Sequence, residues 1–352
     1  MAWKGVLAEF RERIHIDGLD DAVTLLEGNT PLIPAPRLAE WIGGGLKHLF
    51  LKYEGLNPSG SFKDRGMTAA VTQARADGAT TIICASTGNT SASAAAYAAR
   101  AGIKCIVLVP DGKVALGKLA GSLIYGAKVV AIRGSFDDGL RLVREVSDKN
   151  PIVLVNSVNP ARIQGQKTGA FEICDALGEA PDIHALPVGN AGNITAYWLG
   201  YREYLADGRI SKAPAMIGAQ AEGSAPIVLG HPVEHPETLA TAIRIGNPAR
   251  WREAVCALDE SGGQIHAVSD AAILEAYSAV SRLEGVFCEP SSAAGLAGMR
   301  KAVQKGVLNV KGKTAVTILT GHGLKDPDTA LKVADPAITI DANYDALLKV
   351  IA

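Results

Sequence analysis

The sequence lacks the features that mark secreted, membrane-bound and disulfide-stabilised proteins. Only five of its 352 residues are cysteines, and no pair of them has the spacing of a metal site or of a redox motif. We therefore expect a reduced, cytoplasmic protein. The N-terminal segment is charged and has no apolar core like that of a signal peptide. No apolar run is long enough to cross a bilayer, so we expect no membrane association.

An excess of either charge is also missing. The 35 lysines and arginines nearly balance the 36 aspartates and glutamates, and no basic tract stands out. We therefore expect no nucleic-acid partner. His231 and His235 have the i,i+4 spacing of a helical metal site, but each precedes a proline, which argues against such a helix. We predict no metal site.

What the sequence does contain is a long alternation of strand and helix signals. Apolar runs with β-branched residues predict strands over Thr80–Ala85, Lys104–Pro110, Lys128–Arg133, Ile152–Asn156, Ile183–Val188, Ala215–Gln220 and Thr314–Leu319. The segments between them predict helices over Ser91–Arg100, Val114–Tyr125, Phe136–Lys149, Ile163–Leu177, Ile194–Leu205, Asp270–Leu283 and Ser292–Gln304. This alternation predicts an α/β fold of twisted, mainly parallel sheets flanked by helices.

The length of the chain suggests about two domains, and its 48% apolar composition is ample for a buried core. We predict a small α/β domain at 61–159 and a large α/β domain built from 1–60 and 160–352. Residues 221–264 are rich in glycine, proline and histidine and are predicted to be irregular. The segment 333–352 is predicted to form a short strand and then a helix that begins at Asp341 or Asn343.

The stretch LKYEGLNPSGSFKDRG, residues 51–66, contains a candidate catalytic lysine, Lys63. It predicts a strand end, a turn, and a helix that opens at about Lys63. A partly buried lysine near the positive end of a helix is shifted toward its neutral amine. Schiff-base chemistry needs such a nucleophilic amine. From these residues alone, an ordinary surface lysine in a first helical turn remains the alternative.

Four loops follow predicted strands at the edge where α/β sheets bind ligands. They are Ser86–Thr90, Asn156–Arg162, Gly189–Asn193 and Thr320–Asp326. Gly189–Asn193 opens a helix and predicts a phosphate site, although it is neither a Walker loop nor G-x-G-x-x-G, and a plain Gly-Asn turn is the alternative. Ser86–Thr90 could hold a carboxylate or simply cap a helix. Arg162 could bind a phosphate through its planar fork, with a solvated arginine as the alternative. Glu289–Ser292 is predicted to be a turn and a helix cap.

Six ordered segments between Lys52 and Asp326 carry a resemblance to a known family. They are KYEGLNPSGSFKDRG (52–66), ASTGNTSAS (85–93), NSVNPARIQGQKT (156–168), PVGNAGN (187–193), EPSSAAGLAG (289–298) and TGHGLKD (320–326). Together they resemble the threonine synthases, which are pyridoxal-phosphate enzymes of fold type II in the tryptophan-synthase-β-like group. The resemblance implies pyridoxal 5'-phosphate in a cleft between the two domains, and a homodimer.

The resemblance also implies roles for the candidate residues. Lys63 resembles the catalytic lysine that carries the cofactor, Asn89 the partner of the cofactor's phenolic oxygen, and Thr320 the partner of its pyridine nitrogen. The loop that resembles the family's binding site for the cofactor phosphate consists of Gly189, Asn190, Ala191, Gly192 and Asn193. The residues that resemble the family's substrate-binding residues are Ser86, Thr87, Thr90, Asn156, Ser157 and Arg162. Among these, Arg162 is implied to bind the substrate phosphate.

The implied reaction converts O-phospho-L-homoserine and water to L-threonine and phosphate, by γ-elimination and β-addition of water, as the last step of threonine biosynthesis. Within the same fold, a threonine dehydratase or a cysteine synthase is the alternative. No G-G-G-G-L run stands where a dehydratase would have its phosphate loop. A non-catalytic pyridoxal-phosphate binder is the alternative from another class.

Overall fold

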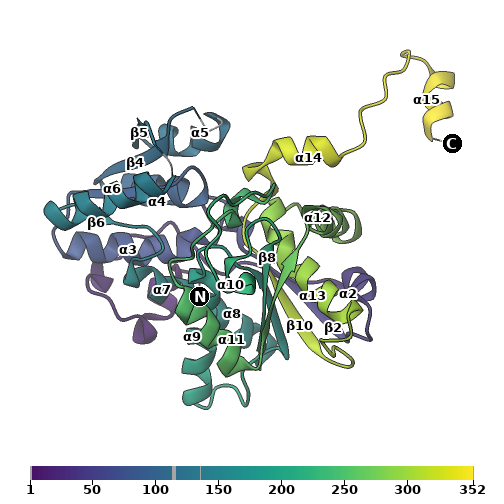
Figure 1. The fold of residues 1–352 in the computed structure, drawn as a ribbon, viewed down its shortest axis with the longest axis horizontal. Coiled ribbons are helices and arrows are strands. Elements are labelled where there is room, and N and C mark those ends of the chain that lie inside the picture. The colour runs from purple at the N-terminus through teal and green to yellow at the C-terminus, as the bar shows by residue number, and fades with distance from the viewer. Residues whose placement is uncertain (1, 113–115, 135, 352) are drawn as a thin grey trace.

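The computed structural model of the protein describes residues 2–112, 116–134 and 136–351. It confirms the predicted α/β fold, with two sheets flanked by helices (Figure 1). The smaller sheet has four parallel strands in the order β5-β4-β3-β6. Its elements are β3 (Thr81–Ala85), α4 (Asn89–Ala101), β4 (Lys104–Pro110), α5 (Leu116–Ile124), β5 (Lys128–Ile132), α6 (Phe136–Lys149) and β6 (Val153–Leu154). Val114 and Ala115, at the start of one predicted helix, lie outside the described residues.

The larger sheet has six strands in the order β1-β2-β10-β7-β8-β9, and every neighbouring pair except β1–β2 is parallel. The strands are β1 (Leu32–Pro34), β2 (His48–Tyr53), β7 (Ile183–Pro187), β8 (Ala215–Ala221), β9 (Gln264–Val268) and β10 (Thr314–Leu319). The chain leaves this sheet after β2, forms the smaller sheet, and returns at β7. The division into domains at 61 and 159 stays a prediction.

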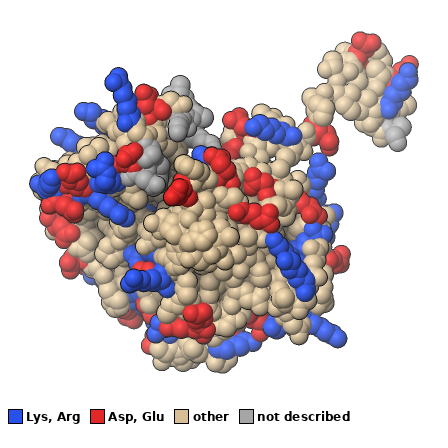
Figure 2. All heavy atoms as spheres, in the orientation of Figure 1, with Lys and Arg blue, Asp and Glu red and all other residues tan. Residues whose placement is uncertain are grey.

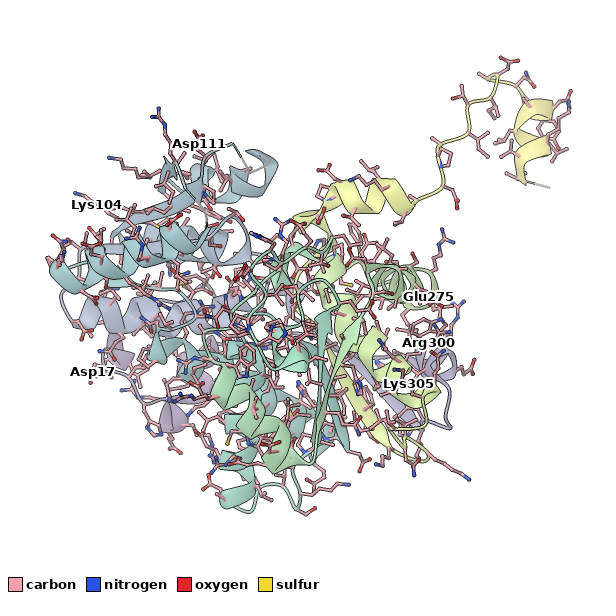
Figure 3. The ribbon with its side chains drawn as sticks, viewed as in Figure 1. Asp17, Lys104, Asp111, Glu275, Arg300 and Lys305 are labelled. Carbon is pink, nitrogen blue, oxygen red and sulfur yellow. The ribbon has the colours of Figure 1, made fainter. Side chains whose placement is uncertain are left out.

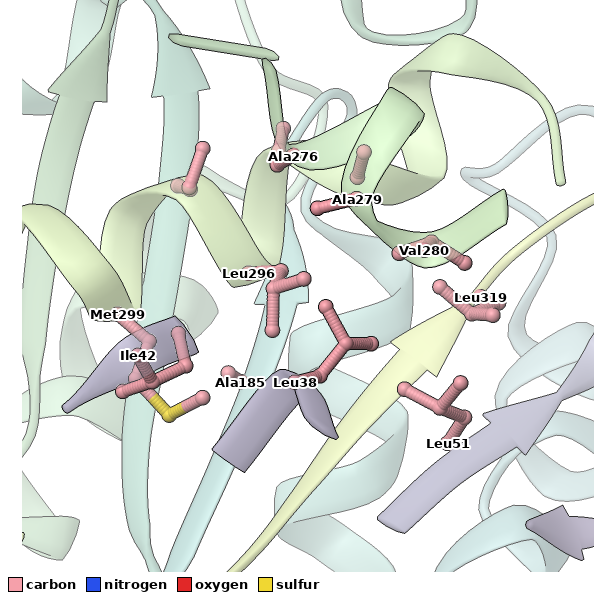
Figure 4. Packing of buried hydrophobic residues seen from close by; sticks show 14 of the residues in the cluster. Leu38, Ile42, Leu51, Ala185, Ala276, Ala279, Val280, Leu296, Met299 and Leu319 are labelled. Carbon is pink, nitrogen blue, oxygen red and sulfur yellow. The ribbon is translucent and has the colours of Figure 1, made fainter. Parts of the chain in front are cut away.

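Helices cover both faces of the larger sheet. They include α2 (Pro36–Ile42), α8 (Thr168–Leu177), α9 (Gly192–Ala206), α11 (Trp251–Ser261), α12 (Asp270–Glu284) and α13 (Ala294–Gln304). Figure 4 shows one of these layers, in which Leu38 of α2 and Leu296 of α13 pack with Leu51 of β2 and Leu319 of β10. All four side chains are fully buried, and each contributes about 1.5–3 kcal/mol of burial free energy.

Three local predictions were wrong. Residues 221–264 are not irregular throughout, because they contain α11, whose buried Ala254, Ala257 and Leu258 have helical spacing. The predicted helix 163–177 is two helices, α7 (Pro160–Gln166) and α8, which meet at Lys167. No strand forms within the described residues 334–343. The final helix, α15 (Tyr344–Ile351), does begin at Asn343, whose Oδ1 accepts the Ala346 N–H at 2.9 Å.

A buried ion-pair cluster of Lys52, Glu54, Arg65 and Glu172 joins the larger sheet to the helices that lead to and from the smaller one. Arg65 of α3 (Lys63–Ala76) donates to Glu54 at 2.7 Å and to Glu172 of α8 at 2.6 Å. Lys52 of β2 donates to Glu172 at 2.7 Å. The two cations lower the pKa of Glu172 to about 2 against the opposing effect of its burial. The beginning of α3 is therefore anchored to the larger sheet by charge pairs.

A glycine sets the separation of α3 and α7. A Cβ atom at Gly165 would lie 1.8 Å from the Arg65 carbonyl oxygen, so no other residue fits without moving a helix. We expect Gly165→Ala to lower the free energy of unfolding by about 1–3 kcal/mol, measured by urea denaturation. The matched control is Gly121→Ala in α5, where the nearest atom to the new Cβ lies at 3.6 Å. Equal stability of the two variants would contradict the expectation.

On the face shown in Figure 2, positive and negative side chains are interspersed and neither sign forms a broad patch. Among the described residues, no helix is long and apolar enough to cross a membrane.

Candidate active site

Lys63 is the first residue of α3, as predicted, and its side chain is half-buried. Its amine lies 4.0 Å from the centre of the Phe62 ring, and no described residue accepts a hydrogen bond from it. Burial, with a smaller contribution from the Arg162 guanidinium, lowers the pKa of Lys63 to about 7, while the Glu289 carboxylate opposes this shift. About half of the Lys63 amines are then neutral at pH 7, which is the form a nucleophile needs.

The Gly189–Asn193 loop follows β7 and opens the fifteen-residue helix α9. Ala191 has a φ of 63°, a left-handed conformation that is costly for a residue with a side chain. Both polar atoms of the Asn193 amide are buried and have no hydrogen-bond partner in the structure. An unpaired buried amide at a helix N-terminus, where backbone N–H groups are also free, fits an anionic ligand.

Gly192 faces open space within this loop. The nearest atom to a Cβ built there is Ser157 Cβ at 4.0 Å, so a side chain could enter without striking the protein. The space beside the Gly192 Cα is therefore open. The Asn190 side chain points elsewhere, since its Oδ1 accepts the Ala249 N–H at 3.3 Å.

We expect Gly192→Val to weaken binding of pyridoxal phosphate by at least about tenfold, because its side chain would fill that space while the fold is retained. Spectroscopic titration of the apoprotein measures the affinity, and circular dichroism checks the fold. Gly121→Ala again serves as the control. Wild-type affinity in a folded Gly192→Val protein would remove this loop from the cofactor site.

Thr320 ends β10, and Glu289, which the sequence interpretation treated only as part of a cap, lies against it. Thr320 Oγ1 donates to Glu289 Oε1 at 3.1 Å, and Asn89 Nδ2 lies 2.9 and 3.1 Å from the two Glu289 oxygens. Pro290–Ala293 does form a 3₁₀ turn ahead of α13, as predicted. The Glu289 side chain makes no capping bond, however, and points into the site.

The Ser86–Thr90 loop connects β3 to α4, and all five of its residues, including Thr87, are half-buried. Asn156, at the end of β6, pairs its amide with both backbone groups of Ala85 at 2.9 and 3.0 Å. It therefore holds the start of this loop in place. The Ser157 carbonyl oxygen accepts a hydrogen bond from Arg250 Nε at 3.1 Å, so α11 supports the second loop.

Arg162 lies on α7, and only 1% of it is exposed, which excludes the alternative of a solvated arginine. Its Nη1 donates to the Val155 carbonyl oxygen at 3.2 Å, and its Nε has no acceptor in the structure. No carboxylate of the described residues pairs with it. Burial, with a smaller contribution from the Arg250 guanidinium, lowers the pKa of Arg162 to about 10. A buried cation without a counter-charge is costly, so this position suits a bound anion.

All four loops lie at carboxyl ends of strands, as predicted, and the structure brings them together. β4 runs from Lys104 toward Asp111, both labelled in Figure 3, and this direction gives the carboxyl edge of the smaller sheet. The Asn89–Glu289 hydrogen bond and the approach of Ser157 to Gly192 connect that edge to the loops of the larger sheet. The arrangement places a partly neutral lysine, an unpaired arginine and a free helix N-terminus around one site.

The chain matches the model of one protein family, described as pyridoxal-phosphate dependent enzyme, over residues 23–321. Curated relatives carry the name threonine synthase. The protein from Mycobacterium leprae is 61% identical over 94% of this chain and 91% of its own length. The Synechocystis protein is 58% identical over 94% of this chain and 85% of its own length. The Halalkalibacterium halodurans protein is 57% identical over 96% of this chain and 94% of its own length.

Solved structures with the same fold are more distant in sequence. Maize serine racemase superposes with a TM-score of 0.76 at 21% identity, covering 94% of this chain and 97% of that one. Cysteine synthase from Entamoeba histolytica superposes with a TM-score of 0.73 at 24% identity, covering 89% and 90%. These likenesses show a shared fold, that of the fold type II pyridoxal-phosphate enzymes.

Proposed function

The chain belongs to the pyridoxal-phosphate-dependent enzyme family, and we propose that it is a threonine synthase that converts O-phospho-L-homoserine and water to L-threonine and phosphate. The names of relatives at 57–61% identity over nearly the full chain support this activity. The observation that carries it is Arg162, a buried guanidinium without a carboxylate partner beside the Lys63 amine. A substrate with a phosphate on its side chain supplies the missing negative charge.

The residues of the chain divide the work of this reaction. The N–H groups of Gly189–Asn193 would bind the cofactor phosphate, and Asn89 and Thr320 would hold its ring. The bound cofactor supplies an electron sink for the reacting carbon atoms. Lys63 would hold the bound cofactor, and its amine could move protons at Cα and Cβ of the substrate. Its pKa of about 7 suits both removal and return of a proton near neutral pH.

The substrate is held by the loops on the smaller-sheet side. Ser86, Thr87 and Thr90 offer hydroxyl and backbone donors to its carboxylate. Asn156 and Ser157 border the space near Arg162, which binds the side-chain phosphate. Two separate anion sites, the α9 N-terminus and Arg162, match the two phosphates of the cofactor and the substrate. A dehydratase or cysteine synthase has no need of the second site.

A cytoplasmic homodimer in which the cofactor binds between the two domains completes the proposal. The five cysteines are free of disulfides, which agrees with a reducing compartment. The end of the chain supports self-association, because α15 projects from the rest of the protein and exposes Tyr344, Leu347 and Ile351 (Figure 1). A helix of eight residues is not stable alone in water and needs a partner surface. Sedimentation of the full chain measures the oligomeric state.

The decisive experiment is turnover of O-phospho-L-homoserine by the purified holoenzyme. Phosphate and L-threonine should appear in equal amounts. L-threonine offered as the only substrate is the control, since a dehydratase would convert it to 2-oxobutyrate and ammonia. Phosphate release without threonine, or rapid loss of threonine, would contradict the proposal. Binding of the cofactor without turnover of either substrate would favour a non-catalytic binder.

A further inference from the structure

Glu289 connects the two residues proposed to hold opposite sides of the cofactor ring. It is 5% exposed and lies between Asn89 at the start of α4 and Thr320 at the end of β10. It is held firmly, because a Cβ built on Gly321 would lie only 2.6 Å from its carboxyl carbon. The Glu289 side chain thus joins the smaller-sheet side of the site to the larger-sheet side through direct hydrogen bonds.

The chemistry of a carboxylate determines the direction of each bond. An ionised carboxylate only accepts, so the NH₂ group of the Asn89 amide must face Glu289. If one N–H is shared by the two carboxylate oxygens, the second N–H is left to donate into the site. The Thr320 hydroxyl likewise donates to Glu289, and Ser292 Oγ, which accepts the Gly321 N–H at 3.1 Å, donates to Thr320 at 2.9 Å. A lone pair of the Thr320 oxygen remains for a donor on the ligand.

We propose that Glu289 is a positioning residue that fixes the hydrogen-bonding directions of Asn89 and Thr320 toward the cofactor ring. The inference rests on the cofactor-binding roles proposed above, not on the identity of the substrate. In the proposed reaction, Glu289 does not contact the Cα or Cβ atom of the substrate. It acts through the two residues that it holds and through its negative charge.

The charges around Lys63 and Glu289 give this inference a second, independent readout. The Arg162 guanidinium lowers the pKa of Lys63, and the Glu289 carboxylate raises it. Burial raises the pKa of Glu289 itself, and its hydrogen bonds and the ammonium groups of Lys325 and Lys63 offset this rise only in part. Removing the Glu289 charge should therefore lower the pKa of Lys63, so that the neutral amine persists at lower pH.

The test is Glu289→Gln, which keeps the shape and removes the charge. We expect affinity for pyridoxal phosphate to fall about tenfold to a hundredfold, because the glutamine NH₂ group would replace an accepting oxygen and place a donor against the Asn89 NH₂ group. In the apoprotein, the pH midpoint for labelling of Lys63 by an acylating reagent, followed by mass spectrometry, should move down by about one unit. Glu40→Gln, at an exposed carboxylate on α2, is the matched control and should change neither value.

Glu289→Asp separates the effect of the hydrogen-bonding geometry from the effect of the negative charge. It also provides a test of the proposal if Glu289→Gln does not fold. It keeps the charge but shortens the reach, so the Lys63 midpoint should stay near that of the wild type while cofactor affinity falls. Wild-type affinity in either folded variant, or an unchanged Lys63 midpoint in Glu289→Gln, would overturn the proposal. Neither readout involves the amino-acid substrate, so a different substrate for the enzyme would leave this result intact.

Discussion

Replacement of Lys63 by alanine should lower turnover by at least about 10³-fold, because the variant loses both the group that carries the cofactor and the group that moves protons. The Arg162 guanidinium next to it cannot substitute, since its pKa of about 10 keeps it protonated at neutral pH. Steady-state turnover of O-phospho-L-homoserine measures the loss. The purified parent protein, reduced with borohydride and digested, should carry its pyridoxyl label on the Lys63 peptide.

Lys305→Ala is the matched control, because Lys305 is an exposed lysine on the outer side of the larger sheet (Figure 3). It should retain wild-type turnover and the same labelled peptide. A pyridoxyl label on any other lysine of the parent protein would remove Lys63 from the proposed role. Retention of most of the activity by Lys63→Ala would do the same.

Arg162→Ala should lower kcat/KM for O-phospho-L-homoserine by roughly 30-fold to several thousand-fold. Loss of a charge-assisted pair to a bound anion in a desolvated site costs roughly 2–5 kcal/mol, and each 1.4 kcal/mol is about a factor of ten. Cofactor binding and the spectral change on adding L-threonine, which has no phosphate, should be retained. Arg162→Lys should recover only part of the loss, because an ammonium lacks the planar fork.

Removing the charge of Arg162 is expected to lower activity but not stability. Arg162 is a buried cation without a counter-charge, so a neutral side chain of similar length removes a desolvation cost. We expect Arg162→Met to lose turnover on the same scale as Arg162→Ala but to be at least as resistant to urea as the parent protein. Arg282→Met, at an exposed arginine, is the control for a general effect of the substitution. An equal loss of phosphohomoserine and threonine binding would show that Arg162 is not the phosphate ligand. A large loss of stability in Arg162→Met would contradict the expected desolvation cost.

The parts of the fold that the sequence predicted are those that depend on local pattern. Apolar runs bounded by turn residues mark β3, β7 and β10, and each of these strands is followed by a loop of the site. The break at Lys167 was missed because the sequence there reads as one continuous helix. It is the pairing of the buried Lys167 amine with Glu203 of α9, at 2.7 Å, that accompanies the change of direction.

The site residues that the sequence predicted are likewise those with a local sequence pattern. Lys63 and Gly189–Asn193 could be found because a turn followed by a helix has a local signature. Glu289 could not be separated from a cap, since its partners Asn89 and Thr320 are remote in sequence and meet it only in the folded chain. The burial of Arg162 was likewise invisible, because a Pro-Ala-Arg segment carries no sign of what will cover it.

The buried cluster of Lys52, Glu54, Arg65 and Glu172 also restricts how this chain can evolve. Loss of a single member leaves a partner charge buried and unpaired, at a cost of about 3–5 kcal/mol, out of a total stability of about 5–15 kcal/mol for a typical protein. Simultaneous replacement of all four by apolar residues of similar volume would be about neutral or even stabilising. Mutations arise one at a time, however, and every single step toward that end passes through a poorly folded intermediate. We therefore expect these four positions to be inherited together in descendants of this chain, whether or not the cluster makes a net contribution to stability.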